Sequence, residues 1–376
     1  MSPKNLIPDE FARHTLIHLF GQGRLDEALA LSQQMIEIHP KYSLGWKVKG
    51  AIELRRHEFD NAVKSVQKAI ALAPKDWELF NSLGLAFKGL GKIKNAEAAY
   101  KQSIQLNPQY PSVYSNLGAL LRDAGDNKGA LNCYKKKVEL TPDDEEAKYH
   151  VAALAGQLVA AAPTTYVKNL FDQYAESFDQ HLVGSLKYQT PEKIAALFRK
   201  HKQTPTDARI TIYDLGCGTG LMADALSELS ADWFGIDLSE KMLKQAMDKG
   251  RYKQVFCGDL TTEMQAVNNA SVDVVFAADV FVYIGDLAGV FASVQKALKS
   301  GGEFIFSTEE LRNTNTDEST PTDYLLLPSG RYAHSAAYIE TACKAAGLRV
   351  TDLLGTEIRE ERHQPIHGLI VRCTNT

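Results

Sequence analysis

The sequence has little cysteine, and its cysteines follow no metal-binding pattern. Five of them are scattered over 376 residues, and none belongs to a Cys-x-x-Cys pair. Zinc sites and disulfide frameworks need regular cysteine spacing. The sequence therefore predicts no metal site and no disulfide framework, and its scattered thiols favour a reducing compartment, the cytoplasm.

An excess of one sign of charge is also missing. The 42 Lys and Arg residues nearly balance the 46 Asp and Glu residues, so the net charge is −4. Such a chain has no general attraction to nucleic acid or to an anionic membrane. Its most apolar stretch, residues 272–294, contains Asp273, Asp279 and Asp286, and no apolar run follows the first charged residues. We therefore expect neither a membrane span nor a signal peptide.

The first part of the chain contains a repeat of 34 residues. Three sets of residues keep this spacing: Pro40, Pro74, Pro108 and Pro142; Ala28, Ala62, Ala96 and Ala130; Gly50, Gly84 and Gly118. This period, with small residues where helices cross, is typical of tetratricopeptide repeats, each of which is a helical hairpin. One hairpin cannot bury its apolar face alone. We therefore expect an α-solenoid domain over residues 1–162, closed by a helix over 143–162.

Two uses of this array follow from its shape. A stack of hairpins presents a concave surface that binds a protein or peptide. Alternatively, the array packs against the rest of the chain or forms a homodimer. The repeat pattern leaves both uses open.

A glycine-rich loop is the most informative motif of the second part. Residues 214–222 read Asp-Leu-Gly-Cys-Gly-Thr-Gly-Leu-Met and join a β-branched stretch, 210–213, to a helical stretch, 221–229. A strand, a glycine loop and a helix in this order direct backbone N–H groups at a ligand. A dinucleotide fingerprint needs its third glycine at position 221, which is leucine. The spacing instead resembles the first motif of class I S-adenosylmethionine-dependent methyltransferases, with Gly216, Cys217, Gly218 and Gly220 at the cofactor.

Strand and helix patterns alternate after this loop, which predicts a Rossmann-like α/β domain over residues 163–376. We expect strands at 210–214, 233–237, 254–257, 272–277, 303–307, 349–357 and 368–372. We expect helices at 221–229, 240–249, 287–298 and 335–346. Ligands of such sheets bind beyond the carboxyl ends of the strands, so residues at those ends are the candidates for the site.

Three carboxylates stand at these strand ends. Asp214 is predicted to accept from the methionyl ammonium, Asp237 from the ribose hydroxyls and Asp259 from the adenine amino group. Alternatively, Asp237 only caps the following helix and Asp259 is a turn residue. The other predicted cofactor contacts are Leu238 and Met242 at the sugar and adenine, Leu260 through its N–H, and Ala278 beside the transferred methyl. An aromatic stripe with Tyr174, Phe178 and Tyr188 predicts a helical lid, or else plain helix packing.

The acceptor side is less defined by the sequence. Asp279 and Tyr283 follow the fourth strand, where either they face cofactor or acceptor or they hold the turn. Arg331, Tyr332 and His334 are predicted either to provide a base, His334, or to orient an acidic substrate. Alternatively, Ser335 caps a helix and His334 is a structural residue. No Asn/Asp-Pro-Pro-Tyr motif and no Pro-Cys pair follow the fourth strand, so methylation of duplex DNA bases is disfavoured.

The whole chain resembles a bacterial family of methyltransferases that carry tetratricopeptide repeats. The matching stretches are 170–179, 214–220, 279–286 and 329–335. The resemblance implies S-adenosylmethionine as cofactor, and a protein, peptide or small-molecule acceptor. It implies cofactor roles for Asp214, Gly216, Asp237 and Asp259. The competing hypothesis is a repeat scaffold whose second half binds the cofactor without catalysis.

Overall fold

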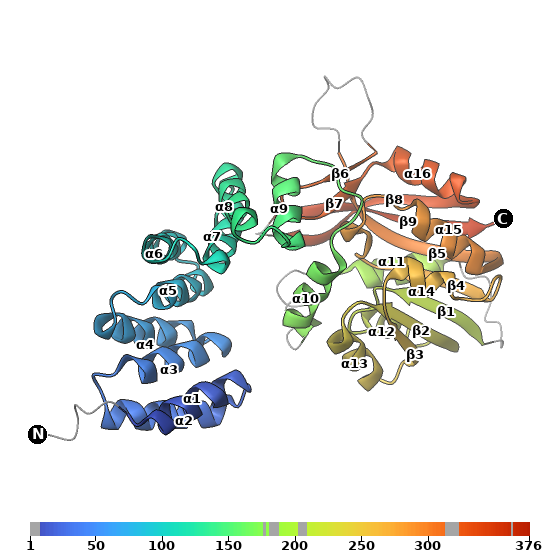
Figure 1. Cartoon of the computed structure of the whole chain (residues 1–376). Coiled ribbons are helices and arrows are strands. Elements are labelled where there is room, and N and C mark those ends of the chain that lie inside the picture. The colour runs from blue at the N-terminus through green and yellow to red at the C-terminus, as the bar shows by residue number, and fades with distance from the viewer. Residues whose placement is uncertain (1–7, 176–177, 180–187, 202–208, 313–322, 362–363) are drawn as a thin grey trace, which may run out of the picture. The chain divides into compact units, whose positions relative to one another are not determined.

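The structure is a computed structural model that describes residues 8–175, 178–179, 188–201, 209–312, 323–361 and 364–376. The chain divides into two compact units, residues 1–154 and 155–376, and each is described by itself (Figure 1). Among the described residues, none of the helices has the length and apolar character needed to cross a membrane.

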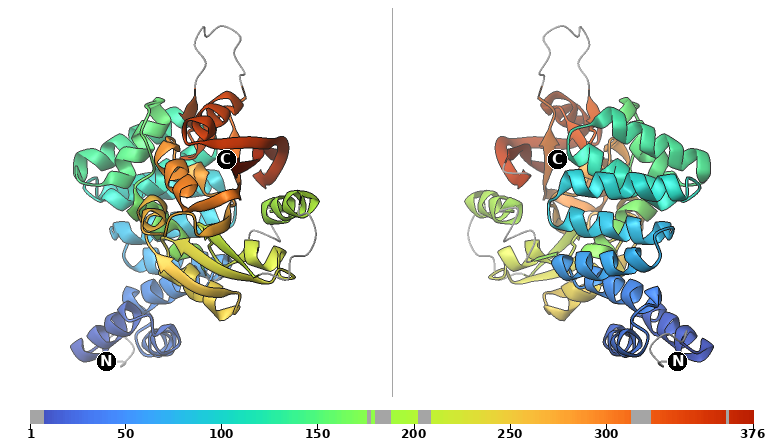
Figure 2. Two further views of the ribbon diagram at one scale, coloured as in Figure 1. Left: turned by 90° about the vertical axis from the view of Figure 1, so that its right-hand side faces the viewer. Right: turned by 90° about the vertical axis from the view of Figure 1, so that its left-hand side faces the viewer.

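The first unit consists of helical hairpins, as the 34-residue period predicts (Figure 2). Its helices are α1 (Glu10–Gly21), α2 (Leu25–Ile38), α3 (Ser43–Arg55), α4 (Phe59–Leu72), α5 (Trp77–Gly89), α6 (Ile93–Leu106), α7 (Pro111–Asp123), α8 (Asn127–Leu140) and α9 (Glu145–Ala155). Helix α9 ends seven residues before the expected end at 162. The reason is Gly156, whose φ of +66° takes the backbone out of the right-handed helical region.

Glycine at the helix crossings makes room for aromatic rings. A Cβ atom built on Gly84 of α5 would lie 2.4 Å from the ring of Tyr100 on α6. At Gly118 of α7 the same atom would lie 3.0 Å from the ring of Tyr134 on α8. Tyr100 is fully buried, so its ring has little room to move. The sequence period thus reflects a steric requirement that is strictest at Gly84.

The second unit is a twisted sheet with helices on both faces. Its strands are β1 (Ile210–Leu215), β2 (Ala231–Asp237), β3 (Tyr252–Cys257), β4 (Val272–Ala277), β5 (Leu298–Glu310), β6 (Tyr324–Leu326), β7 (Tyr332–His334), β8 (Leu348–Glu361) and β9 (Gln364–Asn375). The strand order is β3-β2-β1-β4-β5-β7-β6, and antiparallel β9 joins β8 to β5. Strands β1 to β5 pair in parallel. The order reverses beside β1, which opens a crevice at the carboxyl ends of β1 and β4.

Two apolar layers hold the helices on this sheet. The helices are α10 (Thr164–Tyr174), α11 (Thr190–His201), α12 (Leu221–Ala225), α13 (Glu240–Asp248), α14 (Leu260–Gln265), the 3-10 helix η4 (Phe281–Tyr283), α15 (Ala288–Ala297) and α16 (Ala336–Ala345). One layer packs α14, α15 and α16 on the sheet, and the other packs α11, α12 and α13. Both layers are rich in Val, Ile and Phe residues, as expected for parallel strands that are buried on both faces.

The structure also contains elements that the sequence pattern did not predict. The short strands β6 and β7 and helix α14 are additional, and α12 ends at Ala225 rather than at residue 229. Helix α12 stops because Leu226 takes an extended φ of −120° that leads toward β2. Strands β6 and β7 have three residues each, too few to show an alternation, and the six residues of α14 make fewer than two helical turns.

We expect Gly84→Ala to destabilise the repeat array and Gly118→Ala to be nearly neutral. Alanine gains about 1 kcal/mol of helix propensity over glycine at either position. At Gly84 the added methyl overpacks against the buried Tyr100, which costs about 1–3 kcal/mol and outweighs that gain. At Gly118 the approach to Tyr134 is less close, so the gain and the cost nearly cancel. Thermal unfolding of the full chain, followed by circular dichroism at 222 nm, measures the difference. Equal midpoints for the two variants would contradict this packing argument.

Candidate active site

A cavity of about 660 Å³ opens beyond the carboxyl ends of β1, β2 and β4. Its walls include the glycine loop, the three predicted carboxylates and the aromatic residues of α10. The strands that end at these residues are neighbours in the sheet. Residues more than forty positions apart in the chain therefore meet at one edge. The cavity is the place where the predicted cofactor residues come together.

The glycine loop needs glycine for two separate reasons. Gly216, Gly218 and Gly220 have φ values of +62°, +52° and +90°, a region that side chains other than glycine rarely adopt. A Cβ atom on Gly216 would also lie 2.4 Å from Cγ2 of Val280. On Gly218 the nearest atom would be in the ring of Phe178 at 3.8 Å, an ordinary van der Waals distance, so this position is not crowded. The loop therefore leaves room for a ligand at Gly218. Cys217 lines the same wall.

Asp214 is a buried carboxylate at the end of β1. It is 1% exposed, and its Oδ2 accepts a hydrogen bond of 2.6 Å from the Tyr252 hydroxyl. Burial raises the pKa of Asp214 to about 7, although the Tyr252 hydrogen bond opposes the rise and nearby Asp237 adds to it. A buried carboxylate that ionises near neutral pH is prepared for a cationic partner.

Asp237 at the end of β2 holds the glycine loop in place. Its Oδ2 accepts from the Gly218 N–H at 2.9 Å, and its Oδ1 accepts from the Ser239 N–H at 2.8 Å. Burial raises the pKa of Asp237, and these backbone donors oppose that rise. Each carboxylate oxygen has a second lone pair, so the group can still accept from two ligand hydroxyls. Ser239, not Asp237, caps helix α13.

The residues predicted at the adenine end are only partly brought to the cavity. Leu238, Asp259 and Leu260 line it, whereas Met242 is fully buried and does not. The Asp259 Oδ1 caps α14 by accepting from the Thr262 N–H at 3.0 Å. Asp259 thus has a structural role as well as a position on the cavity wall. Met242 lies on the inner face of α13, which is why the sugar contact predicted for it does not fit.

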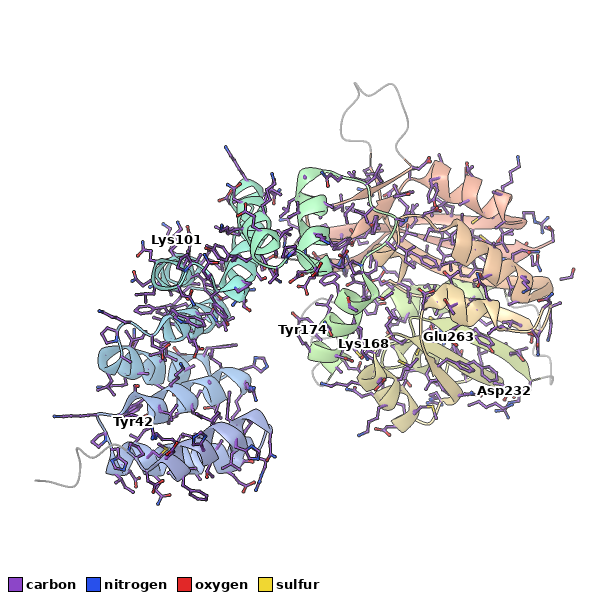
Figure 3. All side chains as sticks on the ribbon, in the orientation of Figure 1. Tyr42, Lys101, Lys168, Tyr174, Asp232 and Glu263 are labelled. Carbon is purple, nitrogen blue, oxygen red and sulfur yellow. The ribbon has the colours of Figure 1, made fainter. Side chains whose placement is uncertain are left out.

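Helix α10 and the residues after it cover one side of the cavity. Tyr174, Phe178 and Tyr188 all line it, and Tyr174 is 47% exposed (Figure 3). Polar contacts join this segment to α13: the Ser239 hydroxyl donates to Asp172 at 2.6 Å, and Gln245 donates to the Ala175 carbonyl at 2.6 Å. The aromatic stripe therefore forms a wall of the cavity.

Residues 160–162, which precede α10, also form part of the wall. Ala161 pairs with Ile284 in an isolated antiparallel bridge. The Ala162 N–H donates to the Tyr283 carbonyl at 2.9 Å, and the Gly285 N–H donates to the Ala160 carbonyl at 2.8 Å. These bonds hold the segment beside Tyr283, which lines the cavity as predicted.

His334 does not have the geometry of the predicted general base. It is fully buried in β7 and does not line the cavity. Its Nε2 lies 3.0 Å and 3.1 Å from the carbonyl oxygens of Ile284 and Gly285, so Nε2 carries a proton and donates to them. Burial lowers the pKa of His334 to about 4, although the two carbonyls oppose this shift. We therefore correct the sequence prediction: His334 fixes the 284–285 turn, as its structural alternative had it.

Tyr332 likewise has a structural position. It is fully buried, and its hydroxyl donates to the Val159 carbonyl at 2.8 Å. Arg331 differs from its neighbours, because it lines the cavity and forms an ion pair with Glu361. Arg331 lies just before β7, whereas Tyr332 and His334, two residues apart in the strand, point to the same face of the sheet. Of the predicted acceptor trio, only Arg331 reaches the site.

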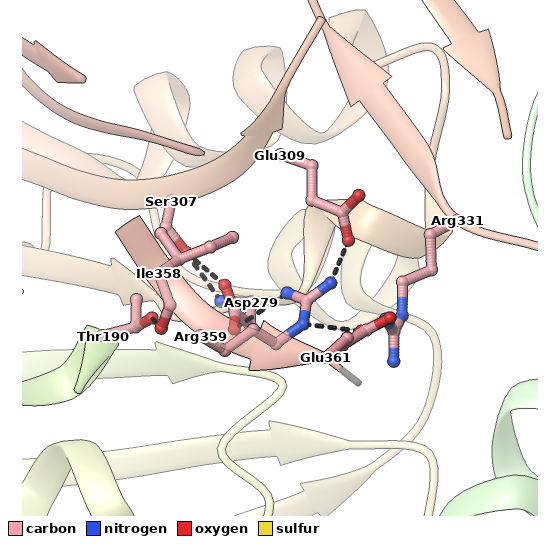
Figure 4. Close-up of polar contacts among 8 residues, drawn as sticks. All are labelled: Thr190, Asp279, Ser307, Glu309, Arg331, Ile358, Arg359 and Glu361. Atoms are coloured by element: carbon pink, nitrogen blue, oxygen red, sulfur yellow. Dashed lines mark hydrogen bonds and ion pairs between the residues drawn. The ribbon is translucent and has the colours of Figure 1, made fainter. Parts of the chain in front are cut away.

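An ion network that sequence reasoning missed lies at the inner end of the cavity (Figure 4). Its centre is Arg359 of β8, which is 6% exposed and lines the cavity. Arg359 donates to Asp279 at 3.4 Å, to Glu361 at 2.9 Å and, through Nη2, to Glu309. Burial opposes the charge of Arg359, but Asp279 and Glu309 outweigh it and raise the pKa of the guanidinium. Arg359 thus remains a cation inside the protein.

Asp279 joins this network to the cofactor side. It follows Ala278, which lines the cavity, and its φ of +55° is a left-handed conformation that Asp tolerates better than most residues. The Ser307 hydroxyl on β5 fixes it, accepting from the Asp279 N–H at 2.9 Å and donating to Oδ1 at 3.0 Å. No spacing in the sequence relates Asp279 to Arg359, because β8 reaches the site only through its pairing with β9.

Comparisons with known proteins agree with this geometry. A family described as "Methyltransferase domain" matches residues 213–306, and one described as "TPR repeat" matches residues 89–122. The chain is similar to three proteins named "Ubiquinone biosynthesis O-methyltransferase". That of Idiomarina loihiensis is 35% identical over 26% of this chain and 41% of its own length. The protein of Paracidovorax citrulli is 31% identical over 39% of this chain and 66% of its own length. The protein of Bordetella avium is 25% identical over 55% of this chain and 84% of its own length. The chain thus spans less than two thirds of the length of the first two of these proteins.

The fold and the site define the second unit as a class I methyltransferase domain, whose cofactor is S-adenosylmethionine. The chain thus combines a match to a tetratricopeptide repeat in its first unit with a match to a methyltransferase domain in its second. The site fits that cofactor, because the buried carboxylate of Asp214 suits a cationic partner and the glycine loop brings no side chain of its own at Gly218.

We expect cofactor affinity to increase with pH through the pKa of Asp214. The methionyl ammonium prefers the ionised carboxylate, and with a pKa of about 7 this form is scarce at pH 6 and dominant at pH 8. Affinity should therefore rise about tenfold between pH 6 and pH 8. Tyr252→Phe removes a hydrogen bond to the ionised form and should move the midpoint to higher pH. Isothermal titration with S-adenosylhomocysteine measures both effects. An Asp214→Asn variant with the same pH dependence would contradict the assignment.

Proposed function

We propose that this protein is an S-adenosylmethionine-dependent methyltransferase. The observation that carries the proposal is the meeting of Asp214, Asp237 and the Gly216–Gly220 loop at the carboxyl edge of a parallel sheet, beside a cavity large enough for a second substrate. In our assignment Asp214 accepts from the methionyl ammonium, Asp237 from the ribose and Asp259 from the adenine. Leu238 covers the sugar, and the Leu260 N–H donates to the adenine ring.

The residues of the chain position the reactants rather than react themselves. Bound S-adenosylmethionine supplies an electrophilic methyl carbon on a sulfonium sulfur. The carboxylates and the glycine loop hold the cofactor, and the small side chain of Ala278 leaves room for the acceptor in line with that carbon. Phe171, Tyr174 and Tyr188 keep water from the reacting atoms. Alignment and exclusion of water provide much of the acceleration in reactions of this type.

The similar proteins suggest a hydroxyl acceptor as one candidate, because they are named for O-methyl transfer. The family match lies at residues 213–306, which include the glycine loop and the three carboxylates at the strand ends. Cofactor residues do not select an acceptor. The acceptor must therefore be inferred from the other walls of the cavity.

We further propose that the repeat array binds a protein or peptide partner, in keeping with its stacked hairpins. The scattered thiols of the sequence favour a cytoplasmic location. The two units have separate cores, since the apolar layers of the sheet come from residues 194–373 and those of the array from residues 16–120 and their neighbours.

Asp237→Asn should lower the affinity for S-adenosylmethionine about ten- to hundredfold. The amide keeps an acceptor for one backbone N–H but loses the charge that strengthens two hydrogen bonds to the ribose. Isothermal titration of the purified protein gives the dissociation constants. Asp232→Asn is the matched control, because Asp232 lies at the opposite end of the same strand, paired with Lys253 (Figure 3). Wild-type protein that binds neither S-adenosylmethionine nor S-adenosylhomocysteine would favour the scaffold hypothesis.

Removal of residues 1–154 should leave cofactor affinity unchanged and abolish methylation of a protein partner. The residues that line the cavity all follow this boundary. Methylation is measured with a methyl-deuterated cofactor and mass spectrometry of extract proteins, with the full chain beside the truncated one. If the truncated chain labels the same proteins at the same rate, the array does not recruit them.

A further inference from the structure

We propose that the methyl acceptor is an alkyl amine, which the site binds as its ammonium form between the carboxylate of Asp279 and the rings of Phe171 and Tyr283. This inference rests on the proposed function. It assigns the part of the cavity that the cofactor contacts do not use, at the end that contains Asp279, Tyr283, Arg331 and Arg359.

Asp279 has the position and the free capacity to bind a cation. It lines the cavity next to Ala278, and its side chain is 14% exposed. Its Oδ1 accepts from Ser307 and its Oδ2 from Arg359. A carboxylate has about four lone-pair sites, so two remain for donors of a ligand. The two protein donors fix the plane of the carboxylate before a ligand arrives.

The charge around this position is unfavourable for an anionic acceptor. The guanidinium groups of Arg331 and Arg359 are already paired with Glu361 and Glu309. Counted over the residues that the structure describes, the network has three carboxylates and two guanidinium groups, and therefore one net negative charge. Asp286 adds a further carboxylate to the same wall. An acceptor carboxylate or phenolate would have to displace Glu361 and face this excess charge. A cation compensates it.

The aromatic residues of the wall suit the same ligand. The ring of Phe171 lies 5.7 Å from that of Tyr283, edge to face, and 5.9 Å from that of Phe178. Aromatic faces attract ammonium groups and also pack on the alkyl chain that carries them. Asp279 lines the same cavity as these rings, and a carboxylate together with aromatic faces favours an organic cation over a neutral or anionic molecule.

The reaction balances with water as the proton acceptor. The bound ammonium loses one proton to water, because only the neutral amine has a lone pair. That lone pair forms the C–N bond to the methyl carbon while the C–S bond breaks and its electrons remain on sulfur. The products are an N-methylammonium ion and neutral S-adenosylhomocysteine, so no oxidant or further reactant is required.

Three probes that share a phenylethyl group test the inference: phenethylamine, 2-phenylethanol and 3-phenylpropionate, which are cationic, neutral and anionic. Their binding to the full chain saturated with S-adenosylhomocysteine is measured by saturation-transfer NMR. We expect phenethylamine to bind at least about tenfold more tightly than either of the others, the effect of one charge-assisted hydrogen bond. Equal binding of the three, or tighter binding of the alcohol or the carboxylate, would overturn the inference without use of any variant.

Asp279→Asn should abolish the preference for phenethylamine and leave the affinity for S-adenosylhomocysteine within about twofold. Asparagine tolerates the left-handed φ of this position. The matched control is Glu310→Gln, which removes a neighbouring charge at the end of β5, outside the cavity, and should keep the preference. If Asp279→Asn loses cofactor affinity instead, Asp279 serves the cofactor and the inference is wrong. Failure of the wild-type chain to bind S-adenosylhomocysteine refutes the proposed function, which is a separate result.

Discussion

The site depends on the hydrogen bonds that tie the end of β1 to the end of β2. Asp237 accepts from the N–H groups of Gly218 and Ser239, and the Cys217 N–H donates to the Ile236 carbonyl at 3.0 Å. These bonds fix a loop of left-handed glycines that has little conformational preference of its own. Because the loop is fixed by the strand beside it, the cavity wall has a defined shape before a cofactor binds. The same carboxylate that binds the ribose in our assignment is thus also a structural support.

Buried charge is the second constraint on this domain. Asp214 is kept beside a single hydroxyl, that of Tyr252, and burial raises its pKa to about 7. Arg359 is instead surrounded by carboxylates that compensate its burial. Among the described residues that line the cavity, the cations are Arg331 and Arg359 at the inner end, where carboxylates outnumber them. In our proposal the cofactor brings the cation that Asp214 binds, and this difference in charge separates the two substrates along one cavity.

Much of the fold follows from local sequence. The 34-residue spacing predicts helical hairpins. In the structure, its glycines Gly84 and Gly118 make room for the rings of Tyr100 and Tyr134 where paired helices cross. Five parallel strands appear where β-branched runs predicted them, and Ser335 caps α16. The short elements β6 and β7 were not predictable, because their segments are shorter than any hydrophobic period. For the same reason the sequence could not show which side of β7 faces the cavity, and His334 and Tyr332 were assigned to the wrong side.

The sequence by itself determined the two-part architecture, the glycine loop and the carboxylates at the strand ends, because each depends on spacing within one element or one turn. The tertiary structure alone decided the acceptor end. Arg359 reaches Asp279, 80 residues earlier in the chain, only because β8 pairs with β9 and β9 pairs with β5. Contacts of that kind arise from strand pairing across the sheet, and backbone pairing leaves no periodic signal in the residues that it brings together.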